Sequence, residues 1–144
     1  MPNVNIEELR NALEFVSAST IGDERAYISH ETGMIYWISG EIDLDPNTPE
    51  DIENSDLYIE LPHKNDLGLG QDLVMSFIEQ ELPDEFNTVA SYFRKNGAYR
   101  RFKYLLEERD QLEAWYAFEN NAIYNVLSDW CKENDIQIEN SKIL

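Results

Sequence analysis

Basic residues gather in one short segment of a chain that is otherwise strongly acidic. Residues 94–109 hold six of the eleven Lys and Arg residues and only two acids, whereas the remainder holds five basic and twenty-seven acidic residues. The six are Arg94, Lys95, Arg100, Arg101, Lys103 and Arg109. Because guanidinium and ammonium groups donate charge-assisted hydrogen bonds to carboxylates and phosphates, the chemistry that this segment could perform is anion recognition.

Aromatic residues are interleaved with these cations. Tyr99 and Phe102 alternate with Arg100, Arg101 and Lys103 in a segment whose apolar spacing predicts a helix from Ala98. We expect Phe102 to face the protein interior while the cations point outward. The predicted binding residues are Arg94, Lys95, Tyr99, Arg100, Arg101, Lys103 and, from the following helix, Tyr116.

A second interpretation is that the protein neutralises this segment itself. Glu107 lies four residues after Lys103, and Glu108 precedes Arg109. Residues 41–56 contain seven acids, two prolines and no base, which predicts a flexible acidic loop long enough to fold back on the cations. The sequence leaves open whether the cations bind a partner or the protein's own acids.

No catalytic pattern stands out. No Ser, Cys or Lys nucleophile has an evident neighbouring base, and Gly68 and Gly70 lack the third glycine of a phosphate-binding loop. Cys131 is the only cysteine, so no internal disulfide can form, and we expect a packed, unreactive thiol. We predict no catalytic residues and no cofactor, and an enzyme without a recognisable motif remains a third option.

Metal-binding patterns are incomplete. The segment from Asp43 begins like a calcium loop, but Thr48 replaces the required glycine and Asn54 replaces the required glutamate. The two histidines, His30 and His63, lack the spacing of a zinc site, and ligation by both would require the third strand to bring His63 beside the turn at His30. We therefore predict no metal site.

Composition limits the class of protein. A net charge of −18 repels polyanions and anionic membranes at long range, so a protein partner is favoured over nucleic acid. An apolar content of 42% is too high for a disordered acidic chain. No run of about eighteen apolar residues and no secretory signal is visible, so we expect a cytoplasmic protein that does not enter the membrane.

The first half of the chain predicts one helix and three strands. Asn5, followed by Glu8, is typical of a helix N-terminus, and Ile6, Leu9, Leu13 and Val16 recur at helical spacing. Residues 25–29 and 34–38 predict a hairpin whose turn contains Gly33 with a positive φ. Residues 57–61, stopped by Pro62, predict a third strand of the same antiparallel sheet.

The second half predicts helices. Apolar spacing indicates helices over residues 69–82 and 86–97, a third from residue 98, and a last helix that starts from a capping box at residues 110–113. Residues 136–138 predict a short tail strand. The inner face of the last helix is predicted to carry Trp115, Phe118, Ala122, Val126 and Trp130.

These elements predict an α+β fold in a single domain over residues 1–144. A small antiparallel sheet, made of the hairpin and the third strand, should pack with about five helices, and the C-terminal half should be helical.

The order of motifs resembles a known family. Residues 27–37, the acidic loop and Tyr58-Ile59-Glu60-Leu61-Pro62 are similar to the first half of an uncharacterised family of small bacterial proteins, UPF0158. Gly97-Ala98-Tyr99-Arg100-Arg101-Phe102-Lys103, Glu113 to Phe118 and the terminal helix with Trp130 are similar to its second half. The resemblance covers about residues 9–138, departs at the pair Asn120 and Asn121, and implies a cytosolic bacterial protein with no assigned activity.

The sequence thus favours a non-enzymatic interaction module with a bipolar charged surface. Arg100, Arg101 and Lys103 would form one pole and the acidic loop the other, and the partner would be a protein. Nucleic-acid binding through the basic helix, with Tyr99 or Tyr116 stacking on bases, is the alternative. The oligomeric state does not follow from the sequence.

Overall fold

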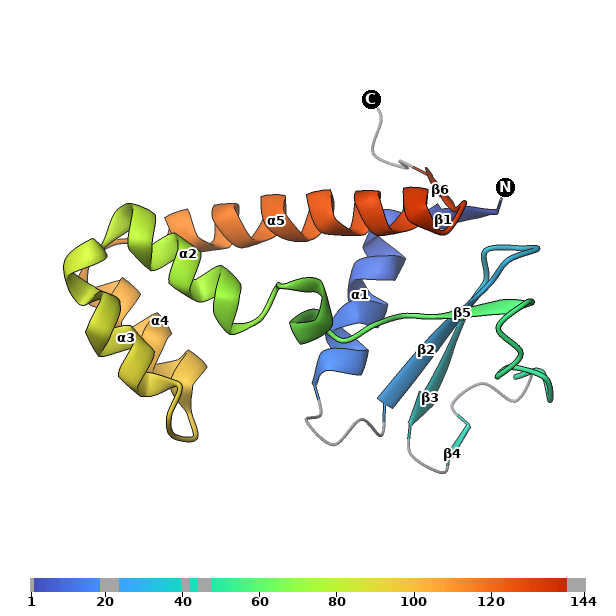
Figure 1. The fold of residues 1–144 in the computed structure, drawn as a ribbon, viewed down its shortest axis with the longest axis horizontal. Coiled ribbons are helices and arrows are strands. Elements are labelled where there is room, and N and C mark those ends of the chain that lie inside the picture. Colours follow the sequence, from blue (N-terminus) through green and yellow to red (C-terminus); the bar gives the residue numbers. More distant parts are fainter. Residues whose placement is uncertain (1, 19–23, 40–41, 44–47, 140–144) are drawn as a thin grey trace. The chain divides into compact units, whose positions relative to one another are not determined.

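The computed structural model describes residues 2–18, 24–39, 42–43 and 48–139. The chain divides into two compact units: unit 1 comprises residues 1–67 and 124–144, and unit 2 comprises residues 68–123. Figure 1 labels the elements in chain order. The fold is α+β with a helical C-terminal half, which confirms the predicted fold class. The prediction of one domain stays a prediction.

Unit 1 combines one complete helix, the end of a second and short strands. In chain order its elements are β1 Asn3–Asn5, α1 Ile6–Ser17, β2 Glu24–Ser29, β3 Ile35–Ser39, β4 Ile42–Asp43, β5 Tyr58–Glu60, the 3-10 helix η1 Lys64–Leu67, the end of α5 Leu112–Glu133, and β6 Gln137–Glu139.

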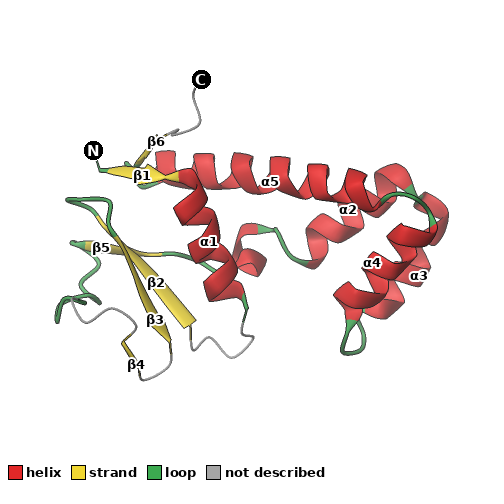
Figure 2. Ribbon diagram, turned by 180° about the vertical axis from the view of Figure 1, so that it is seen from behind, coloured by secondary structure: helices red, strands yellow, loops and turns green. Residues whose placement is uncertain are grey.

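The main sheet of unit 1 is antiparallel and has the strand order β4-β3-β2-β5. Strand β2 is central, so that Tyr27 pairs with Tyr36 of β3 on one side and with Glu60 of β5 on the other. Figure 2 shows the long β2–β3 pair beside α1. The predicted hairpin and the predicted third strand are both confirmed.

The hairpin turn depends on a glycine. The Gly33 N–H donates to the Ser29 carbonyl at 2.9 Å, and the Ser29 N–H donates to the Met34 carbonyl at 2.9 Å. Gly33 has a φ of +78°, as the sequence predicts, and a Cβ added there would collide with the backbone carbonyl of Asn3. The close approach of β1 therefore restricts this position to glycine as strongly as the turn does.

Helix α1 begins with the predicted cap. The Asn5 side chain accepts hydrogen bonds from the N–H groups of Glu7 at 2.9 Å and Glu8 at 3.2 Å, which satisfies two otherwise free donors of the first turn. Leu9, Ala12, Leu13 and Val16 are buried on the inward face.

A parallel pair of strands, β1 with β6, joins the two ends of the chain in unit 1. The tail strand lies at residues 137–139 instead of 136–138, and its partner strand β1 was not predicted. Three-residue strands are too short to show an alternating pattern, and only the buried Val4 marks β1 as part of the core.

The acidic segment 41–56 is not entirely loop. Ile42–Asp43 form β4 and pair with β3. Residues 50–56 form turns, and Ile52 is buried within unit 1. Residues 41 and 44–47 of the predicted loop lie outside the described residues.

Unit 2 is helical. Its elements are α2 Gln71–Glu81, the 3-10 helix η2 Pro83–Glu85, α3 Phe86–Tyr92, α4 Ala98–Glu108 and the first half of α5. An aromatic cluster forms its core. The ring centroid of Trp115 lies 5.4 Å from that of Phe77 and 5.0 Å from that of Phe102, both nearly edge to face. Such pairs add about 0.5–1.5 kcal/mol each beyond the area that they bury.

The predicted inner face of α5 is only partly correct. Trp115 and Trp130 are buried, whereas Ala122 and Val126 are only partly covered, and Ile123 and Leu127 take the fully buried places.

The predicted capping box at residues 110–113 is wrong. Asp110 has a φ of +57° and lies just beyond the C-terminus of α4. The Gln111 N–H donates to the Leu106 carbonyl at 2.8 Å and the Asp110 N–H to the Glu107 carbonyl at 3.3 Å, which is the Schellman pattern of a helix end. Asp110 therefore terminates one helix instead of starting the next, and α5 begins at Leu112.

Asp110→Gly should stabilise the protein by about 0.5–1 kcal/mol, because glycine adopts a positive φ without the steric cost of a side chain. Urea unfolding measures the change. A capping role for the Asp110 side chain would instead make the substitution neutral or destabilising.

Gly33→Ala should cost about 1–3 kcal/mol more than Gly68→Ala. Both glycines have similar positive φ values, +78° and +72°, but only the Cβ at position 33 meets another backbone segment, and nothing lies within 4 Å of the one at position 68. Equal losses of unfolding free energy would show that β1 does not approach the turn as described.

Candidate binding surface

The predicted cations lie around one helical hairpin of unit 2. Helix α3 ends at Tyr92, and Arg94 and Lys95 follow it in a turn, their N–H groups each donating at 3.2 Å to carbonyls of the last residues of α3. Gly97 then reverses the chain with a φ of +81° and caps α4 without a side-chain hydrogen bond. Arg94, Lys95, Arg100 and Arg101 thus belong to one turn and the first helical turn after it.

The inward face of α4 fixes the directions of its cations. Ala98, Phe102, Leu105 and Leu106 are buried, so Arg100, Arg101 and Lys103 are exposed on the rest of the helix surface. Residues two apart on a helix differ by about 160° in direction, so Arg101 and Lys103 lie on opposite flanks, with Arg100 between them. The predicted basic pole is therefore broad, because its three cations point in different directions around α4.

Tyrosines accompany the cations on this surface. Tyr99 stands edge to face against Phe93 with ring centroids 5.3 Å apart, and burial, with the nearby Glu119 carboxylate, raises the pKa of its hydroxyl. Lys103 Nζ lies 5.7 Å from the centre of the Tyr116 ring, within the range of a cation–π contact. These three predicted residues thus have defined places in unit 2.

Tyr104 was missed by the sequence analysis. It is 61% exposed, the largest exposed fraction among the large hydrophobic residues described. It lies four residues after Arg100 and three after Arg101, so both arginines neighbour it on the helix surface. The available signal was this spacing, since a tyrosine opposite the buried Phe102 face must point to solvent.

Ion pairing within unit 2 involves only one of its six cations. Arg109 pairs with Glu85 at 3.0 Å and with Glu108 at 3.6 Å. Every residue of unit 2 is described, and within this unit Arg94, Lys95, Arg100, Arg101 and Lys103 form no ion pair. The expected pair of Lys103 with Glu107 is not formed there, and Lys103 lies over Tyr116 instead.

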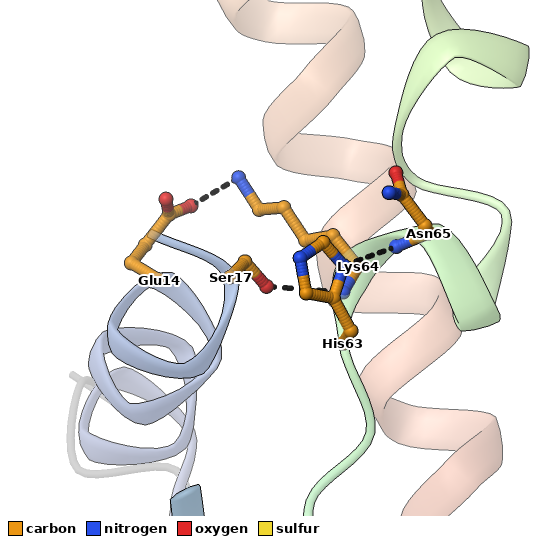
Figure 3. A network of polar contacts seen from close by, with 5 residues as sticks. All are labelled: Glu14, Ser17, His63, Lys64 and Asn65. Atoms are coloured by element: carbon orange, nitrogen blue, oxygen red, sulfur yellow. Dashed lines mark hydrogen bonds and ion pairs between the residues drawn. The ribbon is translucent and has the colours of Figure 1, made fainter. Parts of the chain in front are cut away.

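Unit 1 has its own charge contacts. Arg25 pairs with Glu53 of the acidic segment at 3.6 Å. Figure 3 shows Lys64 of η1 paired with Glu14 of α1, while its N–H donates to the Ser17 hydroxyl at 3.0 Å. A cation at the C-terminal end of α1 also complements the helix dipole. The Lys64 contacts tie η1 to α1, and the Arg25 contact ties β2 to the acidic segment.

The two histidines and the cysteine have ordinary surroundings. His63 Nδ1 accepts a hydrogen bond from the Asn65 N–H at 3.0 Å (Figure 3), and His30 lies in the hairpin turn. Among the described residues, no group of three or more His, Cys, Asp or Glu side chains is arranged to hold a metal ion. Burial raises the pKa of the Cys131 thiol to about 11, so the thiol stays protonated at neutral pH.

None of the described helices combines the length and the apolar character that a membrane crossing requires.

Comparison with known proteins places the chain in a family. No family model matches it, and no solved structure gives a significant match. It is 30% identical to the UPF0158 protein PA5073 of Pseudomonas aeruginosa over 138 residues, which cover 93% of this chain and 84% of that relative. An identity of this size over nearly the whole of both chains confirms the resemblance noted in the sequence: this chain belongs to the UPF0158 family.

Proposed function

We propose that the protein is a non-enzymatic interaction module whose α3–α4 hairpin binds an acidic surface of a partner protein. The observation that carries the proposal is the set of five exposed cations that form no ion pair within unit 2 (Arg94, Lys95, Arg100, Arg101, Lys103). Long cationic side chains that lie at one hairpin and form no ion pair within their own unit favour binding of an external anionic group.

Residue types on the hairpin also support a protein partner. Tyr99 and Tyr104 are exposed beside the arginines, and the exposed Tyr116 of α5 lies beside Lys103. Tyrosine and arginine are enriched at the energetically dominant positions of protein interfaces. Tyrosine adds a large contact area at a small entropic cost, while arginine offers bidentate hydrogen bonds to carboxylates.

Net charge argues against nucleic acid as the main partner. The chain carries −18 overall, and unit 2 itself holds ten acids against six basic residues. Long-range repulsion of a polyanion would oppose binding, while an acidic patch on a compact partner contacts the hairpin only over a short range. The cations also diverge around α4 instead of following one line, as a nucleic-acid backbone would require.

Charge reversal at the hairpin should abolish capture of the partner. We expect the Arg100→Glu, Arg101→Glu variant to lose a protein that the unaltered chain captures from a bacterial lysate, with or without nuclease. The matched control is Lys132→Glu, since Lys132 is exposed on the part of α5 in unit 1. If nuclease treatment removes the captured partner, the partner is bound through nucleic acid and the proposal is contradicted. If the double variant still captures the partner, Arg100 and Arg101 are not binding residues.

Arg109→Gln should lower stability slightly and leave capture of the partner unchanged. Removing its ion pairs with Glu85 and Glu108 should lower the unfolding free energy by about 1 kcal/mol, because Arg109 and Glu108 are exposed and Glu85 is only partly buried. Capture should remain unchanged. A loss of capture at unchanged stability would extend the binding surface to the C-terminal end of α4.

A further inference from the structure

A second surface lies in unit 1, where the main sheet is only partly covered. Helix α1 packs mainly on β2 and less on β3. Four strands about 4.8 Å apart make a sheet wider than the roughly 10 Å that one helix covers. Ala26 and Ile28 of β2 are fully buried on the side of α1, whereas their cross-strand partners Trp37 and Ile35 in β3 are only partly buried.

The uncovered part of β3 forms one wall of a groove. The groove has a volume of about 540 Å³ and is lined by Glu8 and Asn11 of α1, by the turn residues 32–34, and by Ile35 and Trp37. Met34 is 55% exposed at its edge. The Phe15 ring supports Trp37 at 4.9 Å between centroids, which holds the indole in place beside the groove.

We propose that this groove binds a basic amphipathic helix of a partner protein. A helix laid beside α1 would complete the layer over β3, burying its apolar side chains against Met34, Ile35 and Trp37. Its basic residues would lie next to Glu8, in a unit that contains nineteen acids and five basic residues.

Charge also selects against other occupants. A second copy of this chain would bring another −18 to an already acidic surface, and an acidic helix would meet Glu8 with like charge. The proposal depends only on residues of unit 1. A negative result for the groove would therefore leave the proposal for the α3–α4 hairpin unaffected, and the reverse is also true.

The test uses synthetic helices as probes. One peptide of about eighteen residues, five helical turns, carries Leu on one face and Lys on the other; a second replaces Lys by Glu, and a third scrambles the Leu/Lys order. Trp37 serves as the reporter, because Trp115 and Trp130 are buried. We expect the amphipathic Leu/Lys peptide to shift the tryptophan emission to the blue and to saturate, with weaker binding by the other two peptides.

Two exposed apolar residues give a matched pair of variants. Met34→Lys should weaken binding about tenfold or more, because it removes apolar contact and places a cation in the groove. Leu57→Lys, at a residue of unit 1 that is 44% exposed and does not line the groove, should leave binding unchanged. Equal weakening in both variants, or no saturable binding by the Leu/Lys peptide, would overturn the proposal.

Glu8→Lys provides a second variant if Met34→Lys does not fold. It should weaken binding of the Leu/Lys peptide and strengthen binding of the Leu/Glu peptide. Sedimentation equilibrium of the unaltered chain tests whether a second copy occupies the groove instead. Self-association that Met34→Lys abolishes would assign the groove to a second copy and contradict the proposal.

Discussion

The packing of Phe102 against Trp115 is the interaction on which the candidate surface depends. It fixes the rotation of α4, so that Phe102, Leu105 and Leu106 face the core of unit 2 while the cations between them must face solvent. Gly97 fixes where this helix begins, because its positive φ lets the chain reverse immediately after Arg94 and Lys95. One aromatic contact and one glycine therefore determine which parts of the basic segment are accessible.

The two units differ in the ion pairing of their cations. In unit 1, Arg25 and Lys64 each pair with an acid of the same unit and hold segments together. In unit 2, Arg109 does the same for η2 and α4, but the remaining five cations lie within one hairpin without an ion pair inside the unit. A solvated cation is easily tolerated at a protein surface, so these five side chains need no ion pair for the stability of unit 2.

Patterns longer than one helical turn or supported by a cap were predictable from the sequence. The Asn5 cap, the Gly33 turn and the inward direction of Phe102 in α4 all follow from local residue types. Features that depend on distant segments were not: β1 and β6 are too short to show a pattern, and Asp110 fits a helix end as well as a helix start. For the candidate surface, residue types alone predict the cations and Tyr116 as binding residues, and that role stays a prediction. Spacing cannot tell whether Lys103 contacts Glu107 or the Tyr116 ring, and in the structure it lies over the ring.

The most direct test of the central claim is photo-crosslinking from the hairpin itself. A photoreactive amino acid replaces Tyr104, which is exposed and uncharged, and the crosslinked product is identified by mass spectrometry in bacterial cells. Tyr124, exposed in unit 1, is the matched control position. We expect position 104, and not position 124, to crosslink to a protein with an acidic surface, in a product that Arg100→Glu, Arg101→Glu abolishes. Crosslinking to nucleic acid, or to the same proteins from both positions, would contradict the account.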